Sequence, residues 1–86
     1  MKSHRKSYYS GENSAANELY QNGLKYYLGT GGAMKNYKTA VDYLLKAVEK
    51  GSADAMFLLG NCYENGFGVE KNEKIAVEWY EKAAEK

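Results

Sequence analysis

The segment ADAMFLLGNCYENGFGVEKNEKIAVEWYEKAAEK, residues 53–86, decides the fold, because its apolar residues recur at helical spacing on both sides of one glycine-containing loop. The first apolar face comprises Ala55, Leu59, Cys62 and Tyr63, and the second comprises Ile75, Ala76, Trp79, Tyr80 and Ala83. Ser52 and Asn72 stand where N-caps are expected, and Gly66 stands where a left-handed residue ends a helix. The segment therefore predicts two antiparallel helices joined by a short loop.

The residues before this segment repeat its pattern with one more residue in the loop. At an offset of 37, Gly60, Tyr63, Gly66 and Gly68 fall on Gly23, Tyr26, Gly29 and Gly31, and at an offset of 36, Asn72, Ala76 and Ala83 fall on Asn36, Ala40 and Ala47. We therefore expect a degenerate first hairpin over residues 15–51, with its first helix from about Ala15 to Leu28, and a second hairpin over residues 52–86.

Two glycines recur inside predicted helices, where glycine costs on the order of 1 kcal/mol relative to alanine. These are Gly23 and Gly60, and we expect them to mark close approach to the partner helices at Ala40 and Ala76. Small residues on both sides would let the two backbones of each hairpin come together.

Charge is distributed unevenly along the 86 residues, whose net charge is +1. Residues 1–10 carry +3, residues 11–51 carry +1 and residues 52–86 carry −3. We expect residues 1–14 to form a flexible polar and basic leader. Neither a signal peptide nor an apolar run of about 20 residues is present, so we expect a cytoplasmic chain without a membrane segment.

The sequence offers little chemistry for catalysis or for holding a cofactor. His4 lies in the leader, and the single cysteine, Cys62, lies on a helix beside core tyrosines, where a buried and inert thiol is usual. The loop glycines Gly66 and Gly68 lack the preceding strand and the third glycine of a phosphate-binding loop. We therefore expect no catalytic residue, no metal, no cofactor and no enzymatic activity.

The second hairpin resembles the Sel-one-like repeat (SLR), a relative of the tetratricopeptide repeat (TPR). The matching residues are Ala55, Leu59, Gly60, Tyr63, Gly66, Gly68, Val69, Ala76, Trp79, Tyr80, Lys82, Ala83 and Ala84. The first hairpin departs from the pattern, with Glu18 at the expected alanine and Asn22 at the expected leucine. The resemblance implies a TPR-like, all-α solenoid of two helix-turn-helix repeats that acts as a scaffold or adaptor for protein–protein interaction.

The resemblance also implies a binding surface, because relatives bind peptides or proteins on a concave surface lined by the first helix of each hairpin. Carried over to this sequence, the surface comprises Asn17, Tyr20, Leu24, Tyr27, Asp54, Phe57, Asn61 and Glu64. Two alternatives stay open: Tyr20 and Phe57 pack between the hairpins, and Asn17, Asn61 and Glu64 are simply exposed to solvent.

Two further interactions are considered. A nucleic acid could bind the basic and tyrosine-containing arm at the N-terminus, although the second hairpin is acidic. The chain could also associate with itself, because solenoid repeats need about three copies to bury their faces and Trp79 and Tyr80 are expected to be partly uncovered. We therefore expect dimerisation that depends on concentration, or low thermal stability.

Overall fold

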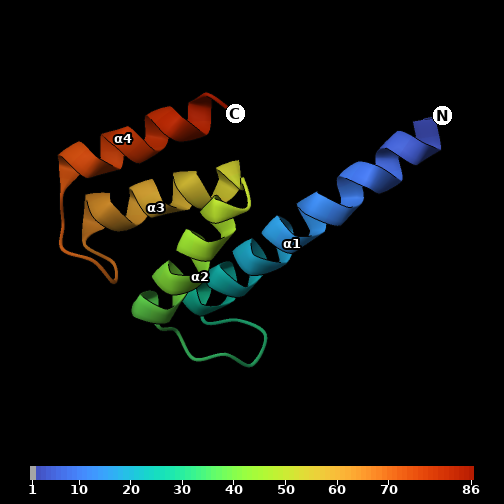
Figure 1. Ribbon diagram of the computed structural model, residues 1–86. Coiled ribbons are helices and arrows are strands. Elements are labelled where there is room, and N and C mark those ends of the chain that lie inside the picture. The colour runs from blue at the N-terminus through green and yellow to red at the C-terminus, as the bar shows by residue number, and fades with distance from the viewer. Residues whose placement is uncertain (1) are drawn as a thin grey trace.

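The computed structural model describes the backbone of residues 2–86 and the side chains of residues 14–86. This part of the chain forms four helices and no strand: α1 (Lys2–Leu28), α2 (Tyr37–Glu49), α3 (Ala53–Asn65) and α4 (Glu73–Ala84). Helices α1 and α2 form one hairpin, α3 and α4 form the other, and α2 packs against α3 to join them (Figure 1). The predicted all-α architecture of two hairpins is confirmed.

The starts of α2, α3 and α4 and the end of α3 lie where the local sequence predicts them. The side-chain oxygens of Asn36 and Asn72 each accept a hydrogen bond, at 3.0 Å, from the backbone N–H three residues on, and the Ser52 hydroxyl does the same. Gly66 ends α3 with φ at +75°, the left-handed conformation that glycine adopts without steric cost. These caps are local, and they fix the lengths of both hairpins.

Helix α1 begins at Lys2, well before the start near Ala15 that the sequence predicted. The chain contains no proline, and the one glycine in this stretch, Gly11, weakens a helix by only about 1 kcal/mol without breaking it. The side chains of residues 1–13 lie outside the described part, so the flexible leader expected over residues 1–14 stays a prediction. His4 and the basic arm considered for nucleic-acid binding belong to the same segment.

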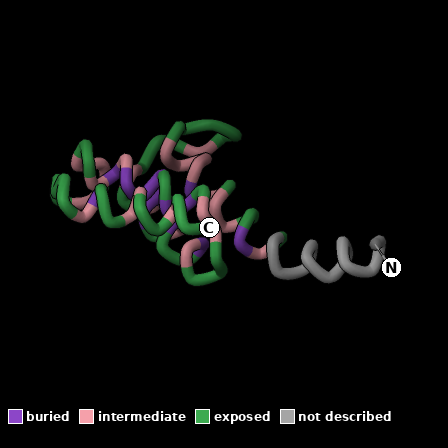
Figure 2. Tube along the Cα trace, turned by 90° about the horizontal axis from the view of Figure 1, so that it is seen from above, coloured by how far each residue is buried: buried purple, intermediate pink, exposed green. Residues whose placement is uncertain are grey.

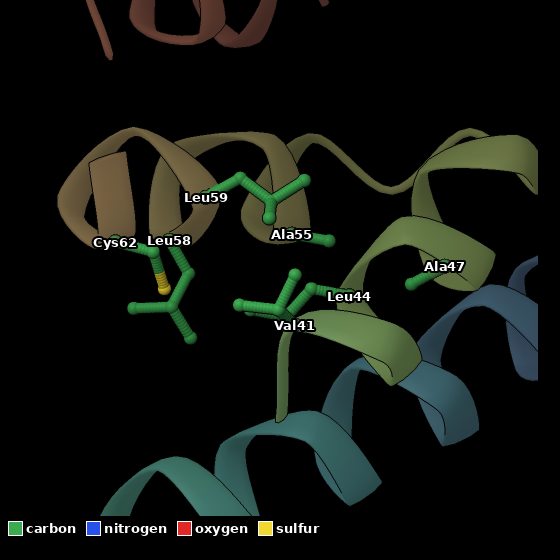
Figure 3. Packing of buried hydrophobic residues seen from close by; sticks show 7 residues of the cluster. All are labelled: Val41, Leu44, Ala47, Ala55, Leu58, Leu59 and Cys62. Carbon is green, nitrogen blue, oxygen red and sulfur yellow. The ribbon is translucent and has the colours of Figure 1, made fainter. Parts of the chain in front are cut away.

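The hydrophobic core lies between α2 and α3. Its fully or nearly fully buried members are Val41, Leu44, Ala47, Ala55, Leu58, Leu59 and Cys62 (Figure 3). Figure 2 shows that buried positions follow the inner sides of the helices while their outer sides are exposed. Full burial of one leucine side chain stabilises a fold by about 2 kcal/mol, so the contact between the two hairpins carries much of the stability of this small chain.

Gly23 and Gly60 mark close approach within each hairpin, as expected, but the residues that they face differ from the prediction. A methyl group on Gly23 would lie 2.9 Å from Leu44 Cδ2, and one on Gly60 would lie 2.6 Å from Tyr80 Cδ1. The Ala40 carbonyl oxygen lies farther from the same methyl position on Gly23, at 3.3 Å. The reason is helical periodicity: Leu44 and Tyr80 come one turn after the expected alanines and point into the same gap.

The loop between α3 and α4 fastens the second hairpin to the first. The Phe67 ring stacks on the Tyr37 ring, with centroids 4.4 Å apart and planes 11° apart. A methyl group on Gly68 would lie 2.6 Å from the Tyr37 carbonyl oxygen, so only glycine allows this approach. The loop is therefore structural, as predicted, and it also forms part of the contact between the repeats.

Candidate binding surface

The described residues contain no group of histidine, cysteine, aspartate and glutamate side chains that could hold a metal ion. Burial raises the pKa of the Cys62 thiol to about 11, and its side chain has no exposed area, so it is protonated and inaccessible at neutral pH. Across the described residues, every helix is too short or too polar to cross a bilayer. The candidate site that the sequence predicts in this part of the chain is the partner-binding surface.

Three of the eight predicted partner-binding residues belong to the first hairpin's contact with the core. Tyr20, Leu24 and Tyr27 are half-buried and pack against the buried cluster. The Tyr27 ring lies edge-on to Phe67 with centroids 6.0 Å apart, and burial raises its pKa. For Tyr20 the alternative of packing between the hairpins describes the structure best, and Leu24 and Tyr27 pack in the same way.

Asn17 and Asp54 are brought together where α1 passes the start of α3. Both side chains are exposed, and they line one hollow of about 200 Å³ together with Ala16, Gly51, Ser52 and Ala53. Burial, followed by the nearby Asp54 charge, raises the pKa of Tyr20. The hollow presents an amide, which both donates and accepts hydrogen bonds, beside a carboxylate, which accepts them.

Phe57 lies one turn after Asp54 on α3, and 55% of it is exposed. It borders a larger, mainly apolar hollow of about 490 Å³, whose other lining residues are Ala53, Asp54, Tyr80, Ala83 and Ala84. Its ring contacts Tyr80 in its own hairpin, with centroids 5.3 Å apart, and does not pack between the hairpins. Asp54 therefore lies between the two hollows.

Asn61 and Glu64 are tied to α4. The Tyr80 hydroxyl lies 2.6 Å from Glu64 Oε1 and 2.7 Å from the Asn61 side-chain amide. A phenol has one proton, so Tyr80 donates to the carboxylate and the Asn61 amide can turn to donate its N–H to the phenol oxygen. Burial and this hydrogen bond raise the Tyr80 pKa to about 12.

The eight predicted residues therefore do not form one uniform groove. Asn17, Asp54 and Phe57 surround two adjoining hollows, Asn61 and Glu64 form a polar cluster with Tyr80, and the remaining three support the core. Sequence reasoning assigned Tyr80 to the inward stripe and missed its part in the polar cluster. The available signal was the position of Tyr80 one helical turn after Ala76, where its hydroxyl can reach the partner helix.

Comparison with known proteins agrees with this architecture. A family model described as Sel1 repeat matches residues 13–52 and again residues 53–86. The crystal structure of a Sel1 repeat protein from Oxalobacter formigenes is similar, with a TM-score of 0.77 and 44% sequence identity, over 81% of this chain and 28% of that one.

Two curated relatives are much longer proteins. The ERAD-associated E3 ubiquitin-protein ligase component HRD3A of Arabidopsis thaliana is 41% identical over 60 residues, which are 70% of this chain and 9% of that protein. The chitin synthase regulator SKT5 of Saccharomyces cerevisiae is 42% identical over 60 residues, 69% of this chain and 9% of that protein. Since the family model matches both hairpins and the solved relative shares their arrangement, this chain belongs to the Sel1 repeat family.

Proposed function

We propose that this chain is a non-enzymatic protein-interaction module that binds a partner protein or peptide on its first helices, α1 and α3. The observation that carries the proposal is the polar hollow where Asn17 and Asp54 meet. These residues come from equivalent positions of the two repeats, and the stacking of the hairpins places them side by side. A surface built by both repeats exists only in the folded chain.

The chemistry of this hollow fits the backbone of a bound peptide. The Asn17 amide can pair with both a peptide N–H and a peptide C=O, while Asp54 accepts from an N–H or from a basic side chain. The exposed Phe57 adds an apolar surface beyond Asp54, and aromatic anchors next to polar groups are typical of binding sites. The names of the two curated relatives describe a component of a ligase and a regulator of a synthase, which are roles that suit an adaptor.

The test compares partners captured from an extract by immobilised wild-type chain, by the double variant Asn17→Ala with Asp54→Asn, and by a control, Asp42→Asn. Asp42 is exposed on α2, away from the hollow, so the control removes one surface charge only. We expect the double variant to lose proteins that the wild type and the control both capture. Identical capture by all three proteins would exclude the hollow as the binding site.

A further inference from the structure

The internal repeat allows the contact between the two hairpins to be compared with the faces at their outer sides. In that contact, Leu58 and Cys62 point from α3 toward the first hairpin (Figure 3). Tyr27 packs against the buried cluster that contains Cys62, and Phe67 stacks on Tyr37. Every one of these side chains is apolar or weakly polar, so the contact is held by burial.

The equivalent positions at the outer sides are mostly polar. The N-terminal face carries Glu18, Gln21, Lys25 and Thr30, at the positions of Ala55, Leu58, Cys62 and Phe67. The C-terminal face carries Phe57, Asn61, Glu64 and Glu73, at the positions of Tyr20, Leu24, Tyr27 and Tyr37. A solenoid contact that repeated the observed stacking would bring these two sets together.

The replacements on the two faces match one another in chemistry. Lys25 holds the position of Cys62 on the N-terminal face, and Glu64 holds the position of Tyr27 on the C-terminal face. Contact between the two faces would therefore set a cation against a carboxylate. Glu64 gives one oxygen to the Tyr80 hydroxyl, which leaves its second oxygen to accept from an ammonium group.

The second pair of positions, Phe67 and Tyr37, becomes Thr30 and Glu73, a hydroxyl donor facing a carboxylate. Gly31 takes the position of Gly68 and keeps its left-handed backbone, with φ at +61° against +76°. The loop of the first repeat is one residue longer, but it also has a left-handed glycine at this position.

The overall charge favours the same arrangement. Residues 1–51 carry +4, the sum of +3 and +1, while residues 52–86 carry −3. A two-fold dimer through the C-terminal faces would bring together two faces that each carry Glu64 and Glu73, and would oppose two acidic hairpins. Contact between unlike faces sets the Lys25 ammonium group against a face that carries Glu64 and Glu73, and this pairing favours one orientation.

We propose that copies of this chain associate head to tail, with the N-terminal face of one copy on the C-terminal face of the next and Lys25 paired with Glu64 across the contact. Such a contact is heterologous, so it leaves a free face at each end and can continue beyond a dimer. The paired residues Lys25 and Glu64 lie outside the Asn17 hollow, although the contact also covers Phe57 next to it.

One residue, Glu18, disfavours the contact, so replacing it should strengthen the association and not weaken it. Glu18 takes the place of Ala55, which is fully buried in the cluster with Leu44 and Ala47. The counterparts of those two residues, Tyr80 and Ala83, line the apolar hollow that also holds Asp54. A carboxylate brought there loses water and meets a like charge, so Glu18→Ala should strengthen the association.

The experiment is sedimentation velocity of the full 86-residue chain over about two decades of concentration at low ionic strength, where charge pairs act most strongly. We expect the wild type to associate more as its concentration rises, and we expect added salt to weaken this association. Lys25→Glu and Glu64→Lys alone should each weaken it by about 10-fold, because an ion pair is lost and a like-charge pair replaces it. The double charge reversal should restore association to within about threefold of the wild type.

Glu78→Lys serves as the matched control. Its counterpart in the first repeat, Asp42, stays exposed although the second hairpin is stacked on the first, so this position lies outside the proposed contact. Circular dichroism of each variant verifies that it is folded. A wild type that stays monomeric throughout, or a Lys25→Glu variant that associates as well as the wild type, would overturn the proposal. A double reversal that fails to recover association would also overturn it.

Discussion

Gly68 offers the sharpest test of how the second repeat is held on the first. Two costs add when Gly68 is replaced by alanine. A left-handed backbone, here with φ at +76°, costs an L-residue about 1–2 kcal/mol. The added methyl group would also lie 2.6 Å from the Tyr37 carbonyl oxygen and 3.0 Å from the Lys38 nitrogen, both backbone atoms that cannot rotate away.

Relieving such a contact costs about 1–3 kcal/mol, as for other overpacked sites. The expected loss in the free energy of unfolding for Gly68→Ala is therefore about 2–5 kcal/mol. A chain of this length has about 4–13 kcal/mol in total, so the variant should lose a large part of its stability.

Gly32→Ala is the matched control, because Gly32 has a similar φ of +84° and no atom within 4 Å of the added methyl group. It should lose only the backbone cost of about 1–2 kcal/mol. The assay is urea unfolding followed by far-ultraviolet circular dichroism, with the midpoint and the slope compared among the three proteins. Equal losses for the two variants would refute the inference that the loop between α3 and α4 packs against the start of α2.

Three further outcomes are expected. Asn72→Ala should lower the free energy of unfolding by about 1 kcal/mol in the same assay, because the first turn of α4 loses its side-chain acceptor; an unchanged midpoint would contradict this. In a spectrophotometric titration, one tyrosine should ionise near pH 12 and be missing in Tyr80→Phe. Because the folded state favours the protonated phenol, the raised Tyr80 pKa contributes stability that is complete below the ordinary tyrosine pKa and is lost as the pH rises toward 12. If all tyrosines titrated at ordinary pKa values, the hydrogen bond to Glu64 would be excluded. The Cys62 thiol should react with a thiol reagent at neutral pH only as fast as the chain unfolds, and rapid modification of the native chain would contradict its burial.

Local sequence determined the repeat and the helix ends other than the start of α1. Asn36 and Asn72 cap helices through the N–H groups three residues ahead, and Gly66 ends α3 through its own backbone freedom. None of these interactions needs a distant partner, so they could be predicted from single residues and their spacing. The same holds for the internal repeat, because equal spacing of small, aromatic and capping residues implies equal hairpins.

The candidate site depended on contacts between residues far apart in the chain. Tyr80 reaches across its hairpin to Asn61 and Glu64, which the sequence presented only as members of an exposed stripe. Asn17 and Asp54 meet because α3 stacks beside α1, and their separation in the sequence gives no measure of that distance.

Helical spacing tells which residues share a face, but it does not tell which neighbour covers that face or how deeply. Tyr20 and Phe57 hold the same position in their repeats, yet the first is half-buried by the second hairpin and the second is exposed. The sequence determined the four helices and their equivalence. The stacking of one hairpin on the other decided which of two equivalent faces is core and which is surface, because burial is a property of the packed neighbour and not of the residue.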